Sequence, residues 1–290
     1  MLAISGLRDL GPRYDAILCD VWGVVHNGRQ HFAAACDALT RFRAGGGVVV
    51  LVTNAPRPNA PIRVQLDGLG VPRAAFDDIV TSGDVTLARI ADHGEAPLHH
   101  IGPPRDLSLF EILRSSTGLN PPLTPLSEAS YVVCTGLFDD HVEVPEDYDA
   151  SLASMRARDL ELISANPDII VHVGDKLLYC SGAIAERYER LGGRVVQAGK
   201  PFAPIYDQAL KLVEARAGKP IPRERVLAIG DGLRTDVKGA RDYGLDCLFV
   251  TTGIHRDDLH GDGAMNEKEL ARLVGEAGAR PTAVIPELVW

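Results

Sequence analysis

Four short apolar runs, each ending abruptly in a polar residue, constrain the fold of this chain most strongly. Each run is continuously apolar and most are rich in β-branched residues, a pattern typical of parallel strands covered on both faces. Stretches with helical spacing separate them, and one that starts near His31 should end at glycines 45–47. This alternation predicts a doubly wound, Rossmann-like parallel α/β sheet. The runs are AILCD (16–20), VVVLVTN (48–54), RVVQAGK (194–200) and VLAIGD (226–231).

The polar residues at the ends of these runs predict a site. In a doubly wound sheet the loops that follow the strands converge at one edge, where ligands bind. Carboxylates gathered beside a hydroxyl, an amide and an ammonium suit a divalent cation next to a phosphoryl group. We therefore expect the strand-end residues to meet around such a group. They are Asp20, Thr53, Asn54, Lys200 and Asp231.

The middle of the chain interrupts this rhythm. Proline-rich turns at Pro103-Pro104 and Pro121-Pro122 punctuate it, and the alternation of strand and helix resumes only near Gly192. We expect an inserted α/β domain over residues 82–180, and a core formed by residues 1–81 and 181–290.

Composition excludes several classes of protein. The net charge is −9 and no basic tail is present, so nucleic acid is not expected as a partner. No apolar stretch is long enough to cross a bilayer, and the first fifteen residues lack the pattern of a secretory signal. The five cysteines contain no C-x-x-C pair, which argues against a zinc ribbon. We predict a soluble, cytoplasmic protein without membrane contact.

Common cofactor and hydrolase motifs fail at particular positions. The stretch that starts at Gly230 has Thr235 where a dinucleotide fingerprint needs its third glycine. A phosphate-binding P-loop fails because Pro201 follows Lys200 in place of serine or threonine. The serine-hydrolase elbow and the zinc-protease helix motif are also missing.

An ordered set of motifs resembles the haloacid dehalogenase-like (HAD) hydrolase superfamily, and within it the subfamily IIA proteins related to NagD-type phosphatases. The resemblance covers nearly the whole chain. It implies that a C2-type cap is inserted between Asn54 and Lys200. The motifs are DVWGVVHNG (20–28), VTN (52–54), ANPD (165–168), GKP (199–201) and GDGLRTDVKGA (230–240).

The resemblance implies a covalent mechanism of phosphate ester hydrolysis. Asp20 looks like the nucleophile that attacks phosphorus and forms an aspartyl-phosphate, which divides one hard displacement into two. Thr53, with the backbone amide of Asn54, looks like the group that holds the phosphoryl oxygens. Lys200 looks like the cation that offsets charge on Asp20 and on the phosphoryl group.

The resemblance also implies a Mg²⁺ site, with one departure from the family pattern. Asp20 and Asp231 look like metal ligands, and Asp236 looks like a supporting carboxylate that binds metal waters or orients Lys200. Trp22 stands where most family phosphatases have a second aspartate that moves protons. Its backbone carbonyl can still ligate the metal, but indole cannot act as acid or base. We expect esters with poor leaving groups to suffer most, because such catalysis is typically worth about 10²–10⁴-fold.

Two replacements for the missing acid are open. His26, four residues beyond Trp22, could take the role of acid and base. Alternatively the inserted domain supplies the proton, with the acidic segment 139–141 as the candidate.

Three functions remain open at this stage. The first is a Mg²⁺-dependent phosphatase acting on a small phosphorylated metabolite. The second is a dehalogenase or a carbon–phosphorus hydrolase, because such relatives also lack the second aspartate. The third is a protein that binds a phosphorylated metabolite with impaired turnover. A homodimer is expected by analogy alone.

Overall fold

The computed structural model describes residues 1–173, 176–261 and 263–290, and the chain forms two compact units. We call residues 1–53, 63–80 and 200–290 the core unit. Residues 54–62 and 81–199 are the inserted unit. Each unit is built around a parallel β-sheet, so the predicted α/β class is confirmed.

The sheet of the core unit has the strand order β1-β13-β12-β11-β2-β3-β4. All pairings from β1 to β3 are parallel. Strands β2, β3 and β11 are buried along their whole length, which explains their continuously apolar sequences. The strands are β1 Leu2–Ala3, β2 Ala16–Asp20, β3 Val48–Thr53, β4 Asp78–Thr81, β11 Val226–Gly230, β12 Asp246–Val250 and β13 Ala283–Ile285.

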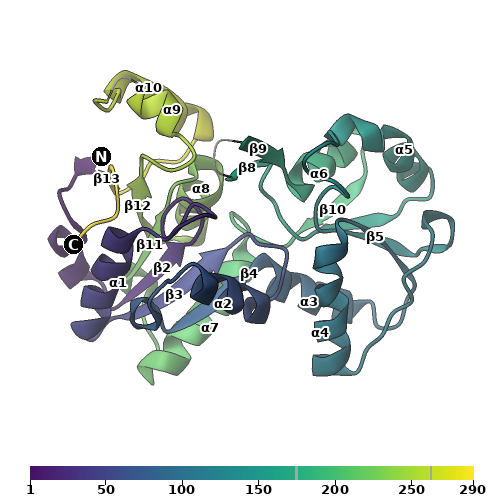
Figure 1. The fold of residues 1–290 in the computed structure, drawn as a ribbon, viewed down its shortest axis with the longest axis horizontal. Helices are drawn as coiled ribbons and strands as arrows, with labels where there is room; N and C mark the ends of the chain where they lie inside the picture. Colours follow the sequence, from purple (N-terminus) through teal and green to yellow (C-terminus); the bar gives the residue numbers. More distant parts are fainter. Residues whose placement is uncertain (174–175, 262) are drawn as a thin grey trace. The chain divides into compact units, whose positions relative to one another are not determined.

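Helices connect these strands. The predicted first helix is present and ends at Gly45, and both α1 and α7 pack on β3 (Figure 1). One π-helical turn, Leu233–Val237, leads into α8. The helices are α1 Ala33–Ala44, α2 Asn59–Gly68, α7 Ala203–Ala217, α8 Lys238–Tyr243, α9 Arg256–His260 and α10 Glu267–Ala277.

The inserted unit has a smaller parallel sheet with the order β10-β7-β6-β5, and β8 and β9 form a separate antiparallel pair. Its strands are β5 Leu98–Ile101, β6 Tyr131–Cys134, β7 Glu161–Ser164, β8 Ile170–Val173, β9 Lys176–Tyr179 and β10 Arg194–Gln197. Its helices are α3 Ser82–Asp92, α4 Ser108–Thr117, α5 Asp149–Ala157 and α6 Ser181–Arg190.

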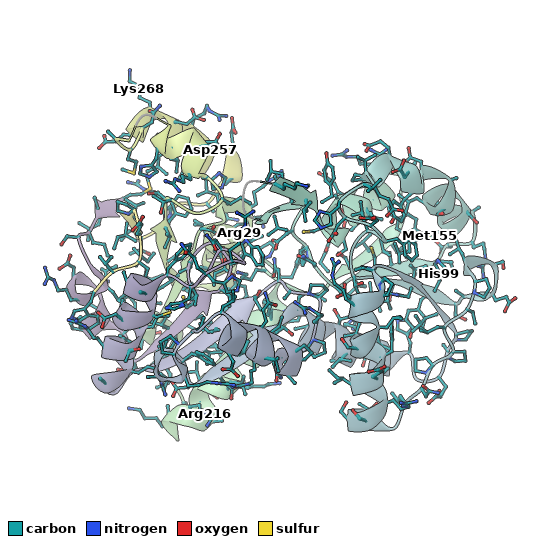
Figure 2. All side chains as sticks on the ribbon, viewed as in Figure 1. Arg29, His99, Met155, Arg216, Asp257 and Lys268 are labelled. Carbon is teal, nitrogen blue, oxygen red and sulfur yellow. The ribbon has the colours of Figure 1, made fainter. Side chains whose placement is uncertain are left out.

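The side chains of β6 alternate between the two faces of its sheet, and each face has a hydrophobic core. Val132 packs in a cluster with side chains of α5 and α6, among them Met155 of α5, which Figure 2 labels. Val133, the next residue, packs in a second cluster with Leu109 and Leu113 of α4. Successive strand residues point to opposite faces, so helices cover both sides.

The structure corrects the sequence analysis on the run that ends at Lys200. Strand β10 pairs with β7 in the inserted unit, and does not join the core sheet with β2, β3 and β11. Residues 181–199 accordingly pack with the inserted unit, whereas the sequence analysis placed them in the core. Residues 54–62 differ in the same way. The reason is that a short apolar strand does not specify its neighbour.

The structure also bears on the cysteines and on membrane-spanning helices. All five cysteines are free and buried. Among the helices of the described residues, none has both the length and the apolar composition needed to cross a membrane.

Candidate active site

Asp20 and Asp231 follow neighbouring strands at the point where the core sheet reverses its order. From β2 the chain proceeds through β3 to β4 on one side, whereas β11, β12 and β13 lie on the other. Asp20 is the last residue of β2, and Asp231 directly follows β11, its parallel neighbour. Ligands of open α/β sheets bind at such a reversal.

Lys200 reaches this point from the loop between β10 and α7. Its Nζ lies 2.6 Å from Oδ1 of Asp20 and 2.7 Å from Oδ1 of Asp236. The three side chains are almost wholly buried. The expected convergence of Lys200 with Asp20 is therefore present, although Lys200 does not stand at the end of a core strand.

Asp236 is oriented by its own loop. Its Oδ2 accepts hydrogen bonds from the Gly232 N–H at 3.0 Å and from the Thr235 hydroxyl at 3.3 Å. The other oxygen, Oδ1, accepts from Lys200. A Cβ on Gly230 would lie 2.0 Å from Cγ of Asp236, so this close approach requires glycine. Asp236 thus fixes the direction of the lysine ammonium.

Asp231 is held by backbone from two loops. Its Oδ2 accepts the Ile254 N–H at 2.7 Å. Gly23, at φ +84°, and Gly253 each approach so closely that an added Cβ would lie 2.0 Å from Oδ2. The carboxylate has little freedom to turn, which suits a ligand of fixed geometry.

Three carboxylates and the ammonium of Lys200 gather in this cluster. Carboxylate oxygens of Asp20, Asp231 and Asp236 lie within 4.8 Å of one another, with one lysine among them. Burial raises the pKa of Asp20 well above its ordinary value, and the charges of Asp236 and Asp231 add to this, against the opposing effect of Lys200. Burial lowers the pKa of Lys200, but Asp20 and Asp236 outweigh it and raise that pKa.

These three buried carboxylates can hold a divalent cation. Hard cations such as Mg²⁺ and Ca²⁺ prefer carboxylate oxygens. A bound divalent ion would offset negative charge on the three carboxylates, and would favour the ionised form of Asp20. The donor set therefore fits the predicted cofactor class.

Trp22 and His26 pack together in the loop after β2. Their rings meet edge to face with centroids 5.0 Å apart, and a Cβ on Gly28 would lie 2.6 Å from the indole. Nδ1 of His26 accepts the Gly28 N–H at 3.0 Å. His26 is 2% exposed, and burial lowers its pKa to about 4, so it is neutral at pH 7. These contacts favour a structural role over the predicted role as acid.

Thr53 and Asn54 follow Val52, which pairs with Asp20 across β2 and β3. Both side chains are buried. Within the inserted unit, Nδ2 of Asn54 donates to Oδ1 of Asp168 at 2.9 Å. Asp168 belongs to the ANPD motif (165–168), and no role for its side chain is predicted from the sequence.

The acidic segment 139–141 belongs to the inserted unit. Asp140 forms an ion pair with Arg105, and Oδ1 of Asp139 accepts the backbone N–H of His141 at 3.0 Å. As the proton donor, this segment stays a prediction.

Comparison with known proteins agrees with the geometry. Residues 17–113 match the family described as haloacid dehalogenase-like hydrolase, and residues 197–289 match the family described as HAD-hydrolase-like. A solved haloacid dehalogenase-like hydrolase from Brucella suis 1330 is 47% identical, with a TM-score of 0.87, over 99% of this chain and 100% of its own.

Two more distant relatives carry functional names. Ribonucleotide monophosphatase NagD of Escherichia coli K12 is 25% identical over 84% of this chain and 90% of its own. A glycerol phosphate phosphatase from Mycobacterium tuberculosis, solved in complex with calcium, is 24% identical with a TM-score of 0.63, over 86% of this chain and 70% of its own. The NagD-like resemblance is confirmed, and the chain belongs to the haloacid dehalogenase-like family of hydrolases.

Proposed function

We propose that the chain is a Mg²⁺-dependent phosphohydrolase that acts on a small phosphorylated metabolite through an aspartyl-phosphate at Asp20. The observation that carries the proposal is the contact of Asp20 with Lys200, 2.6 Å apart and buried beside Asp231 and Asp236. The relatives named as phosphatases support the same reaction class.

Each residue has a role in this reaction. An oxygen of Asp20 attacks phosphorus, the bond to the leaving oxygen breaks, and water later releases phosphate from Asp20. Lys200 offsets charge on Asp20 and on the phosphoryl oxygens, and Asp236 directs its ammonium. Thr53 and the amide of Asn54 hold the phosphoryl group.

Asp20, Asp231 and the Trp22 carbonyl would hold Mg²⁺, with Asp236 supporting the site. The cation supplies charge neutralisation for the phosphoryl group and orients it toward Asp20. Without Mg²⁺, burial and the charges of Asp236 and Asp231 raise the pKa of Asp20, which disfavours the ionised nucleophile.

Trp22 sets the expected substrate preference. The leaving oxygen must gain a proton unless it departs as a stable anion, and neither indole nor the neutral, buried His26 supplies one readily. Activated aryl phosphates should therefore react faster than alkyl phosphates. The segment 139–141 is the remaining candidate donor.

The test is phosphate release from 4-nitrophenyl phosphate, with and without Mg²⁺, in the wild type and in Asp20→Asn. We expect Asp20→Asn to lose at least about 10³-fold in kcat and omission of Mg²⁺ to have a similar effect, because each removes an essential part of the site. Asp15→Asn is the matched control, since Asp15 precedes the same strand and pairs with Arg225. Equal rates in Asp20→Asn and the wild type would refute the proposal.

Trp22 also supports a second candidate, a protein that binds a phosphorylated metabolite with little turnover. Tight binding without phosphate release over hours would favour it. Cleavage of a carbon–halogen bond is less compatible with the site, because Asp231 and Asp236 keep a metal arrangement that such a reaction does not need. Halide release without metal would support that alternative.

A further inference from the structure

Three of the four segments at which the chain passes between its two units are in contact within the inserted unit. The passages fall at 53–54, 62–63, 80–81 and 199–200, and the first, third and fourth are the ones in contact. The Ser82 hydroxyl donates to the Ala198 carbonyl, at 2.5 Å, which joins the third passage to the fourth. A Cβ on Gly199 would lie 2.5 Å from Oδ1 of Asn54 and 2.9 Å from the Ser82 hydroxyl oxygen, so all three segments are in contact.

These passages adjoin residues of the proposed reaction. Asn54 follows Thr53 directly, and Gly199 precedes Lys200 directly. The position of the Asn54 side chain therefore affects the backbone amide that is proposed to bind phosphate. Gly199 limits its movement on one side.

Asp168 holds the Asn54 side chain from another direction. Its Oδ1 accepts from Nδ2 of Asn54 at 2.9 Å, across 114 residues of sequence. A carboxylate accepts such a hydrogen bond more strongly than a neutral group.

The loop that carries Asp168 is itself fixed. The N–H of Asp168 donates to Oδ1 of Asn166 at 3.0 Å, and the N–H of Asn166 donates to the Ser181 hydroxyl oxygen at 3.0 Å. Ser181 in turn donates to the Asn166 carbonyl at 2.8 Å. A Cβ on Gly182 would lie 2.4 Å from the Asp168 carbonyl oxygen, so the loop sits tightly on the start of α6. This is a rigid platform for one carboxylate.

We propose that Asp168 is a positioning residue for phosphate binding, which acts by holding Asn54 so that its amide and Thr53 face the phosphoryl group. This inference rests on the proposed function, because it needs a phosphate subsite at Thr53 and Asn54. It gives the ANPD motif a role that the reaction chemistry alone does not require. Asp168 makes no covalent bond and moves no proton.

The test uses the full chain with Mg²⁺ and two probes, inorganic phosphate binding by calorimetry and orthovanadate inhibition of 4-nitrophenyl phosphate hydrolysis. Asp168→Ala should weaken both by roughly tenfold, as expected for loss of one hydrogen bond to a charged group. Asp168→Asn keeps an acceptor oxygen and should stay within about twofold of the wild type. Asp149→Ala is the control, because it removes a carboxylate that pairs with Arg187 in the same unit.

A double-mutant cycle separates positioning from general damage. Asn54→Ala combined with Asp168→Ala should bind phosphate no more weakly than Asn54→Ala alone, because Asp168 is proposed to act on phosphate through the Asn54 side chain. If Asp168→Ala does not fold, Asp168→Ser removes the same contact with a smaller change in polarity.

Wild-type affinity in Asp168→Ala, or additive losses in the double variant, would overturn the inference. A wild type that binds phosphate but does not turn over would refute the proposed reaction alone, since the binding measurement still tests Asp168.

Discussion

The sheets of the core unit and the inserted unit both consist of parallel strands connected by helices, but they differ in strand order. In the inserted unit the order β5-β6-β7-β10 follows the chain without reversal, whereas the core sheet reverses between β2 and β11. The reversal leaves Asp20 and Asp231 at adjacent strand ends, where connections run away to either side. A parallel sheet alone therefore does not create the candidate site, which also needs the reversal of strand order.

The polar residues after the strands also differ in charge between the two units. After β7 of the inserted unit, the backbone N–H and carbonyl of Asn166 both form hydrogen bonds with the Ser181 hydroxyl. In the core, the carboxylates of Asp20 and Asp236 share the ammonium of Lys200, and the carboxylate of Asp231 lies close to both. The polar groups after β7 fix a loop by neutral hydrogen bonds, whereas those in the core are carboxylates whose charge a cation can offset.

Lys200→Met tests this difference between the two units most strongly. Without added cation, the substitution removes the ammonium that pairs with the buried carboxylates of Asp20 and Asp236, and we expect a loss of about 3–5 kcal/mol of unfolding free energy. Arg187→Met removes ion pairs with Glu146 and Asp149 on the inserted unit and should cost less than about 1 kcal/mol. Urea denaturation measures both. Similar losses in the two variants would contradict the assigned difference.

Two glycines offer a second comparison. Gly253→Ala would place a Cβ 2.0 Å from Oδ2 of Asp231, and Gly102→Ala would place one 2.0 Å from the Thr135 hydroxyl oxygen. Each should cost about 1–3 kcal/mol through forced displacement. Calorimetry should show weaker Mg²⁺ binding, by roughly tenfold, in Gly253→Ala only, as when a metal ligand loses its support. Unchanged Mg²⁺ affinity in Gly253→Ala would count against Asp231 as a ligand.

The smallest expected effect concerns one histidine in each unit, of which His26 is buried and His100 is partly buried. Burial lowers the pKa of His26 and of His100 to about 4, from an unfolded value of 6.5. The folded state binds fewer protons than the unfolded state between these values, so the stabilisation is complete above pH 6.5 and is lost as pH falls toward 4. For His26 the loss between pH 7 and pH 5 should be about 2 kcal/mol.

His26→Asn checks this, because its amide oxygen can still accept the Gly28 N–H. The variant should lack this component of the pH dependence in denaturation at pH 7 and pH 5. His100→Gln should remove a smaller component, because His100 is only partly buried. An unchanged pH dependence in His26→Asn would show that the histidine is not protonated on unfolding.

Sequence alone predicts the parts of this fold that depend on local pattern. Strands β2, β3 and β11 were recognisable because burial on both faces demands continuous apolar sequence. Asp20 and Asp231 followed from the rule that parallel strands end at a common edge. Strand β10 was assigned to the wrong sheet, because four residues do not encode a partner.

Two other contacts could not be predicted from the sequence, for different physical reasons. The Ile254 N–H that binds Asp231 is a backbone group, which every residue except proline offers. The hydrogen bond from Asn54 to Asp168 depends on how distant segments meet, and no spacing rule records it. Neither contact has a residue pattern that would predict it from one sequence.

The packing of Trp22 on Gly28 has a consequence for protein engineering. Installing an aspartate at position 22, to add a proton donor, would vacate the space that the indole fills against Gly28 and the His26 ring. Gly28 cannot simply be enlarged to fill it, because its φ of +82° strains any residue with a side chain. Redesign of the chemistry must therefore rebuild residues 22–28 as a single segment.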